Sequence, residues 1–180
     1  MSKPLQIVFL LACSAFFSQF SHVCAAQQLK SAAPPAPIPT QILTAKRIFI
    51  ANGGGDESPF DSPQYSGGPN RVYNEFYAAM KSWGRYELVG APDEADLVFE
   101  IRLLVVQPQP SEPLGNNNPA YDSQFHLIIR DVKTHQTLWG LTEHAQTAIL
   151  QGNRDKNFEK ALAALVAEVK RIAEPPTIAS

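Results

Sequence analysis

The stretch "ADLVFEIRLLVVQ", residues 95–107, constrains the fold more than any other part of this chain. Successive side chains of a β-strand point to opposite faces of a sheet, so a period of two identifies a strand with one buried face. Here the apolar residues that recur at every second position are Leu97, Phe99, Ile101, Leu103 and Val105. The intervening positions mix apolar and charged residues, which predicts that the second face of the sheet is not covered.

The other periodic segments predict the elements around this strand. Strand patterns occur at residues 46–51, 86–89, 121–132 and 137–147. Helical spacing of apolar residues occurs at residues 69–83 and 155–173. The resulting order, strand, helix, four strands, helix, predicts an α+β two-layer sandwich. Its sheet should be mixed, mostly antiparallel and of about five strands, with both helices on one face.

The last two strands predict a β-hairpin with a defined register. If the apolar residues of both strands face the core, Ile129 must lie opposite Trp139, because a slip of one residue turns a strand's apolar set to the wrong face. A three-residue loop at 133–135 then connects the strands. The final residue of such a loop is commonly left-handed, so we expect a positive φ at His135.

Five side chains are weak candidates for a metal site. His126 and His144 are diagonal neighbours in the predicted hairpin, but zinc or copper needs further ligands, and no acidic neighbour on that face is placed to complete a site. Asp56, Glu57 and Asp61 follow a run of glycines, although their spacing matches no EF-hand loop. We therefore predict no metal site and no cofactor.

The first 26 residues have the features of an export signal, with Lys3, an apolar run and small residues before a cleavage point after Ala25 or Ala26. The localisation predicted is the periplasm or the cell surface. Both cysteines lie in this segment. One of them, Cys13 in "LLAC", resembles the lipidated cysteine of bacterial lipoproteins, and lipidation there is the alternative that attaches the chain to a membrane.

The composition of the remaining residues predicts a tether, a single domain and a short tail. Residues 27–43 contain four prolines and no hydrophobic period, which predicts an extended tether. Residues 44–174 are of ordinary size for a single domain, and residues 175–180 form a short tail. With 15 basic and 17 acidic residues, the chain has a formal net charge of −2, which does not favour nucleic acid as a partner.

The glycine-rich stretch "IFIANGGGDESPF", residues 48–60, lacks the features of nucleotide-binding loops. The lysine and hydroxyl of a Walker loop are missing, as is the third spaced glycine of a dinucleotide fingerprint. We interpret residues 53–68 as a connector whose shortening leaves stability nearly unchanged. The sequence also contains no G-x-S-x-G motif, and we predict that the protein is not an enzyme.

The segments "PDEADLVFEI" and "FHLIIRDVKTHQTLWG" resemble a family of short uncharacterised exported proteins and lipoproteins of the bacterial envelope. More distantly, the order of elements is similar to that of the N-terminal domain of the Tol-system protein TolB and of the curli-secretion lipoprotein. The resemblance implies an envelope location and a role in binding or assembly. It identifies no catalytic residue.

Two functions from different classes are compatible with these features. The first is a non-enzymatic accessory or adaptor domain that binds a protein partner through a strand edge or through the open sheet face. The candidate residues on that face are Val98, Glu100, Arg102, Leu104, Val106, Ile128 and Arg130. The alternative is a periplasmic protein that binds a small ligand or metal with the glycine-rich loop and the proline-rich loop at residues 108–120.

Overall fold

A computed structural model of the chain describes residues 36–55, 64–106 and 122–174. The fold described below belongs to the unit that begins at residue 37. The predicted signal, the lipidation site at Cys13, the tail and the three loop carboxylates lie outside the described residues. Those expectations remain predictions.

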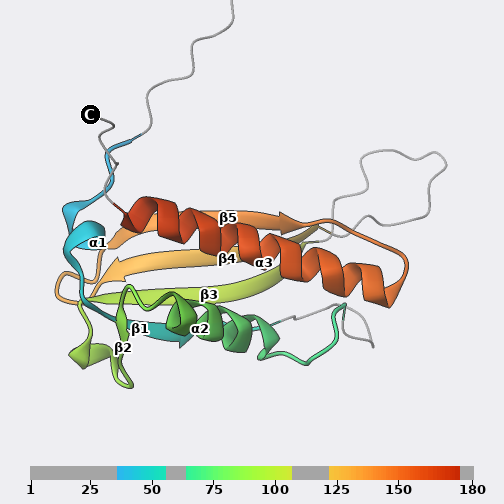
Figure 1. Cartoon of the computed structure of the whole chain (residues 1–180), viewed down its shortest axis with the longest axis horizontal. Coiled ribbons are helices and arrows are strands. Elements are labelled where there is room, and N and C mark those ends of the chain that lie inside the picture. The colour runs from blue at the N-terminus through green and yellow to red at the C-terminus, as the bar shows by residue number, and fades with distance from the viewer. Residues whose placement is uncertain (1–35, 56–63, 107–121, 175–180) are drawn as a thin grey trace, which may run out of the picture. The chain divides into compact units, whose positions relative to one another are not determined.

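The domain contains one mixed five-stranded sheet with the strand order β2-β1-β3-β4-β5 (Figure 1). β1 pairs in parallel with both β2 and β3, whereas β3, β4 and β5 pair antiparallel. The strands are β1 Arg47–Asn52, β2 Glu87–Leu88, β3 Leu97–Val106, β4 Asp122–Asp131 and β5 Thr137–Ala145.

Two long helices, α2 Arg71–Trp83 and α3 Gln151–Ala173, lie on the same face of the sheet (Figure 1). The predicted α+β two-layer sandwich is therefore confirmed, including its order of strands and helices. Two short elements were not predicted. They are α1 Thr40–Thr44 and the 3-10 helix η1 Pro92–Glu94.

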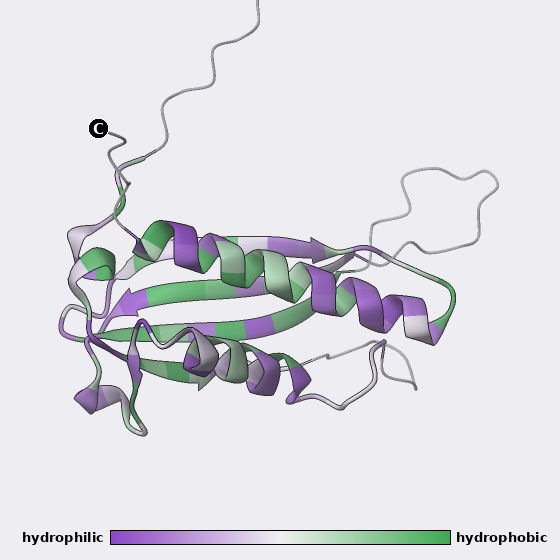
Figure 2. Cartoon of the chain, viewed as in Figure 1, coloured by the Kyte–Doolittle hydropathy of each residue, from purple (hydrophilic) through white to green (hydrophobic). Residues whose placement is uncertain are grey.

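The core lies between the helices and the odd-numbered residues of β3 and β4. Figure 2 shows hydrophobic and hydrophilic residues alternating along these strands. The strand residues that are fully buried in this layer include Phe99, Ile101, Phe125, Leu127 and Ile129, and the stripe of α3 that meets them includes Phe158, Leu165, Val169 and Ile172. Burial of each large apolar side chain stabilises the fold by about 1.5–3 kcal/mol.

The predicted tether ends earlier than residue 43, because α1 is packed against the domain. Ile42 is completely buried, and its carbonyl oxygen accepts a hydrogen bond from Tyr86 Oη at 3.1 Å. Arg85 Nη2 donates to the carbonyl oxygen of Leu43 at 2.8 Å. The proline content of residues 27–43 indicated an extended segment, but a single buried isoleucine is enough to fix its last turn onto the core.

The hairpin has the predicted register, with Ile129 opposite Trp139. The loop is longer than predicted, because a register shift after Ile129 leaves residues 132–135 between Asp131 and Gln136. The Asp131 carboxylate stabilises this longer turn by accepting the Thr134 N–H at 2.7 Å and the Thr134 hydroxyl at 3.0 Å. His135 is exposed and has φ 58°, as predicted.

The described ends of the glycine-rich segment are packed, which makes the interpretation of residues 53–68 as a mere connector wrong for those ends. The Gly53 N–H donates to the Ile101 carbonyl oxygen at 2.8 Å. Gly55 lies so close to Pro69 that an added Cβ would be 1.8 Å from the Pro69 carbonyl oxygen, so this position requires glycine. At the other end, Tyr65 is 6% exposed and its ring lies 5.1 Å from that of Phe158.

Candidate functional site

The sheet face opposite the helices holds all seven predicted partner-surface residues. They occupy even-numbered positions of β3 and β4, whose odd-numbered neighbours fill the core. Six of the seven are half-buried, and Val106 is 42% exposed. β1 extends the same surface with Phe49 and Ala51, which pair with Val98 and Glu100. Phe49 was missed, although the alternation in "RIFIA" could have identified it.

An ion pair between Arg130 and Glu100 crosses the open face. Arg130 Nη1 lies 2.6 Å from Glu100 Oε2, and the two side chains are 39% and 25% exposed. They come from diagonal positions, since Glu100 pairs with Ile128 and Arg130 with Val98. A pair as exposed as this contributes little to stability, on the order of 0–1 kcal/mol. Its main consequence is that the Glu100 carboxylate is already engaged.

A chain of hydrogen bonds runs along the same face from His126 to His144. Carbonyl and carboxylate oxygens only accept, so His126 Nε2 donates to Gln124 Oε1 at 2.8 Å and Gln124 Nε2 donates to Asp122 Oδ2 at 2.5 Å. His144 Nδ1 donates to the other Asp122 oxygen at 2.8 Å. Asp122 is therefore an acidic neighbour of His144 that the sequence pattern did not identify.

The pKa values of Asp122 and His126 in this series of hydrogen bonds depend on their burial and on the charges near them. Burial opposes the ionisation of Asp122, but hydrogen bonds from His144 and Gln124 outweigh it and lower the pKa of that carboxyl. Burial, followed by the positive charge of Arg102, lowers the pKa of His126. Within the described residues, no three His, Cys, Asp or Glu side chains are grouped to hold a metal ion.

Arg102 lies at the centre of the open face, directly opposite His126. Its Nε is buried and has no hydrogen-bond partner. On the β1 side its neighbour is Gly53, where an added Cβ would come within 3.1 Å of Arg102 Cβ. Glu100 Cγ lies equally close to the same point, so Arg102 is flanked there by a glycine without a side chain and by the side chain of Glu100.

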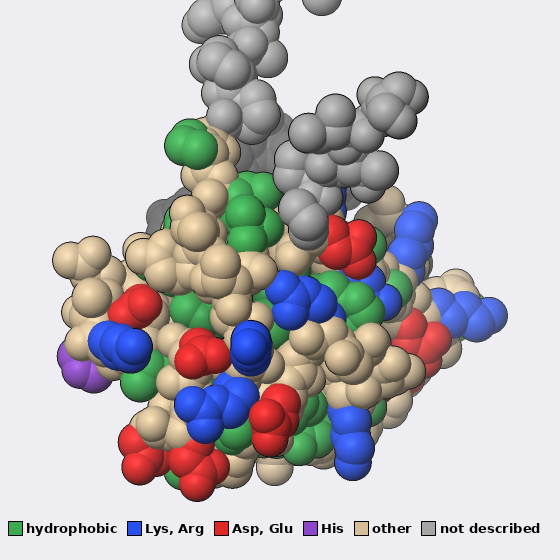
Figure 3. All heavy atoms as spheres, turned by 60° about the vertical axis from the view of Figure 1, so that its left-hand side comes forward, with side chains coloured by type: hydrophobic (Ala, Val, Ile, Leu, Met, Phe, Trp, Pro, Cys, Tyr) green, Lys and Arg blue, Asp and Glu red, His purple; other side chains and the backbone are tan. Residues whose placement is uncertain are grey.

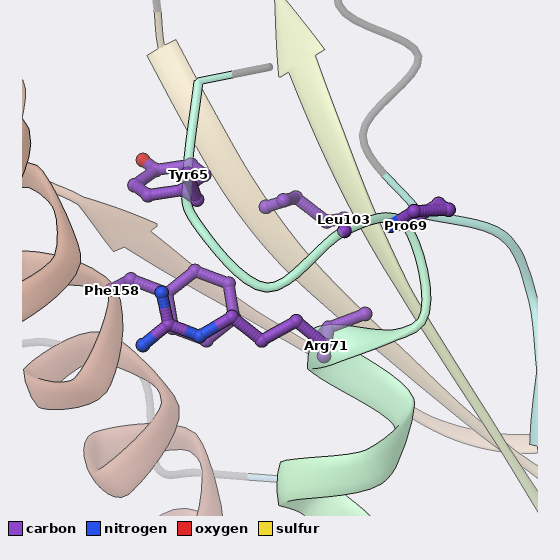
Figure 4. A pocket seen from close by; sticks show the side chains of 7 residues that line it. Tyr65, Pro69, Arg71, Leu103 and Phe158 are labelled. Carbon is purple, nitrogen blue, oxygen red and sulfur yellow. The ribbon is translucent and has the colours of Figure 1, made fainter.

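A cavity of about 210 Å³ opens between the glycine-rich segment, α2 and α3, on the helix-covered side of the domain. Sequence reasoning missed it, because its wall forms only when segments distant in sequence meet. Figure 4 shows the Arg71 guanidinium stacked over the Phe158 ring, 4.2 Å from its centroid, with Tyr65 and Leu103 beside them. The lining residues are Tyr65, Gly68, Pro69, Arg71, Val72, Leu103 and Phe158.

The Arg71 side chain is 11% exposed and fully engaged. Its guanidinium lies 2.6 Å from Glu75, 2.8 Å from Asp155 and 3.4 Å from Glu159. It also donates to the Ser66 carbonyl oxygen at 3.2 Å. With three carboxylates and a backbone oxygen around it, this arginine holds two helices and a loop together and has no free donor pair for a ligand anion.

The surface at the hairpin end of the domain is mixed in charge. Figure 3 shows Lys and Arg side chains interspersed with Asp and Glu, with hydrophobic side chains in small separate patches. Among the described helices, none combines the length and the apolarity that crossing a membrane requires.

No family model matches this chain, and no curated protein matches its sequence. Similar solved structures include XCC0632 from Xanthomonas campestris, described as DUF330, with 13% identity over 76% of this chain and 86% of that chain and a TM-score of 0.44. A PelC dodecamer from Paraburkholderia phytofirmans has 13% identity over 79% and 96%, with a TM-score of 0.44. The uncharacterised lipoprotein B from Nitrosomonas europaea has 10% identity over 77% and 88%, with a TM-score of 0.37.

XCC0632 is described as a DUF330 protein and the Nitrosomonas europaea protein as an uncharacterised lipoprotein. The finer resemblance to TolB and to the curli-secretion lipoprotein remains a prediction. With TM-scores below 0.5, the similarities do not establish a shared function.

Proposed function

We propose that this chain is an exported, non-enzymatic envelope protein that binds a protein partner through its open sheet face. One observation carries the proposal. The face formed by the even-numbered residues of β3 and β4, with Phe49 and Ala51 of β1 beside them, is not covered by any described helix, yet it presents half-buried apolar side chains beside charged ones. Uncovered apolar surface of this kind is typical of an interaction site.

The composition of the face supports a protein as the partner. Phe49, Val98 and Ile128 provide apolar contact area, and Arg102 adds a long guanidinium side chain among them. Aromatic residues and arginine are enriched in protein interfaces, where they supply much of the binding energy. A sheet face of this kind also keeps its shape on binding, since its side chains project from paired strands.

The polar groups of the face support binding in preference to catalysis. Asp122 is held by two hydrogen-bond donors, and Glu100 is paired with Arg130. Neither carboxylate is free to act as a general base. The face also contains no serine or cysteine nucleophile beside a histidine in its described part.

A second function is favoured by the cavity beside the glycine-rich segment, where Gly68 and Pro69 form part of the wall. Its volume of about 210 Å³ is below the roughly 300–1,000 Å³ of ordinary ligand pockets. A small apolar group is the largest ligand it accommodates. We therefore rank small-ligand binding second.

The test is cross-linking of the mature protein in the envelopes of cells that produce it, followed by mass spectrometry and reconstitution with the purified partner. The double variant Val98→Gln/Ile128→Gln alters the open face, and Ala164→Glu alters the exposed side of α3. We expect the double variant to lose the partner at unchanged thermal stability, while Ala164→Glu retains it. Equal binding by both variants would contradict the proposal.

A further inference from the structure

Arg102 is an unpaired cation in the middle of the open face. Its Nε is buried without an acceptor, and its Nη groups, which are not buried, make no hydrogen bond or ion pair within the described residues. A buried donor that lacks a partner costs about 1–3 kcal/mol. The buried Nε is out of reach of an incoming group, so the exposed Nη groups are the donors of Arg102 that an acceptor could use.

The domain itself does not provide that acceptor. Glu100, two residues away on the same face, is 2.6 Å from Arg130. Asp122 accepts hydrogen bonds from Gln124 and His144. Because both carboxylates of this part of the face are engaged, the positive charge of Arg102 is available to an incoming group.

Directly across the strand, His126 forms no hydrogen bond with Arg102 among the described residues. Its Nε2–H is directed at Gln124, and its pKa is lowered by burial and by the arginine itself. On the opposite flank, Gly53 has no side chain. The Arg102 side chain therefore lies between the His126 ring on one side and Gly53 on the other, and neither forms a hydrogen bond with it among the described residues.

We propose that Arg102 binds a carboxylate of the protein partner, through its two Nη groups, when the partner docks on the open sheet face. This assignment rests on the proposed function and adds the chemistry of the partner: an acidic residue flanked by apolar ones. A guanidinium matches a carboxylate in a two-point fork, and such charge-assisted hydrogen bonds are stronger where water is excluded.

The surroundings of Arg102 favour a protein carboxylate over a free phosphate. Leu104 on the same strand is half-buried and next to it on the same face, and Ile128 lies further along the neighbouring strand. These apolar groups would contact the flanking side chains of a peptide, but add nothing to the binding of a phosphate ion. The carboxylates of Glu100 and Asp122 would repel a phosphate dianion more strongly than a singly charged carboxylate, and one guanidinium balances one negative charge.

The experiment uses a ¹⁵N-labelled mature chain and follows the Nε–Hε signal of Arg102 by NMR. The probes are the peptide acetyl-Ser-Leu-Glu-Leu-Ser-amide, its Gln counterpart and inorganic phosphate. We expect the Glu peptide to bind at least tenfold more tightly than the Gln peptide, and this preference to disappear in Arg102→Gln. Arg47→Gln, which removes the same charge from an exposed position on β1, should change the preference less than about threefold.

Equal affinity for the two peptides, no saturable shift, or an equal response to phosphate would overturn the proposal. Thermal unfolding of Arg102→Gln shows whether the variant is folded, and Arg102→Lys provides a variant that keeps the charge but loses the fork. In the cross-linking experiment, loss of the partner in Val98→Gln/Ile128→Gln but not in Arg102→Gln would retain the proposed function and reject the carboxylate. Binding unaffected by all of these variants would reject both.

Discussion

Arg71 and Arg102 are two half-buried arginines in opposite surroundings. Arg71, on the helix side of the domain, has three carboxylates within 3.4 Å and an aromatic ring beneath it. Arg102, on the open face, has no partner within the described residues, and its Nε is buried. The comparison teaches that one arginine maintains the fold, while the other leaves a buried donor without an acceptor and, in our proposal, offers its exposed Nη groups to a partner.

The largest loss of stability is expected for the substitution Arg71→Ala. Removing the guanidinium leaves Asp155 and Glu75 without their cation and uncovers the Phe158 ring, so the free energy of unfolding should fall by about 3–4 kcal/mol. Urea denaturation measures this fall in the free energy of unfolding. Arg102→Met is the matched variant, and it should change stability by less than about 0.5 kcal/mol or increase it. Equal losses in the two variants would remove the distinction between them.

A slightly smaller effect is expected from Tyr65→Ala, which tests whether the loop around Arg71 is part of the fold. Tyr65 is 6% exposed and packs on Phe158, so its truncation should destabilise the domain by about 3 kcal/mol. The midpoint of urea unfolding reports this loss. A change below about 0.5 kcal/mol would restore the interpretation of the segment as a mere connector.

The ion pair between Arg71 and Asp155 should also make stability depend on pH. Burial opposes ionisation of the Asp155 carboxyl, but hydrogen bonds from Ser66, Gln151 and Arg71 outweigh it and lower its pKa. A lowered folded-state pKa stabilises the fold above the unfolded-state value of about 4, and this stabilisation is lost as the pH falls through the folded-state pKa.

Asp155→Asn should therefore lose about 1.5 kcal/mol at pH 7, and the difference from the unaltered chain should shrink steadily below pH of about 4. Urea denaturation at several pH values measures both quantities. A difference that stays constant down to pH of about 2 would show that the carboxylate charge contributes nothing at this position.

The smallest effect concerns the hairpin turn at the end of the open face. His135 has φ 58°, a conformation that glycine adopts without strain, so His135→Gly should stabilise the domain by up to about 1 kcal/mol. Partner binding should not change, because the turn lies outside the residues assigned to the surface. Thermal unfolding measures the first effect and reconstituted binding the second. Loss of binding in a folded variant would extend the surface to the turn.

The sequence determined which residues face the core, because side-chain period and hairpin register are local properties. The alternation around Phe99, the pairing of Ile129 with Trp139 and the positive φ of His135 were all predictable in this way. The same alternation predicted the open face, because the residues between the buried positions must point to the other side of the sheet. The seven candidate residues lie on that side.

The contacts around Arg71 were not predictable from the sequence. Its partner Asp155 is 84 residues away, and only the packing of α2 against α3 brings them together. For the same reason the bond between Asp122 and His144 was missed, since it depends on which residue begins β4. Helix α1 was missed because its one buried residue, Ile42, occurs in a proline-rich context that indicates extension.

The most direct test of a partner on the open face is site-specific photo-cross-linking. A photoreactive phenylalanine analogue replaces Ile128 on the open face in one variant and Ala164 on α3 in another, both produced in the native cell. The account predicts a cross-linked partner from position 128 and none from position 164. A cross-link from 164 alone would contradict it, because the partner would then occupy the helix side of the domain.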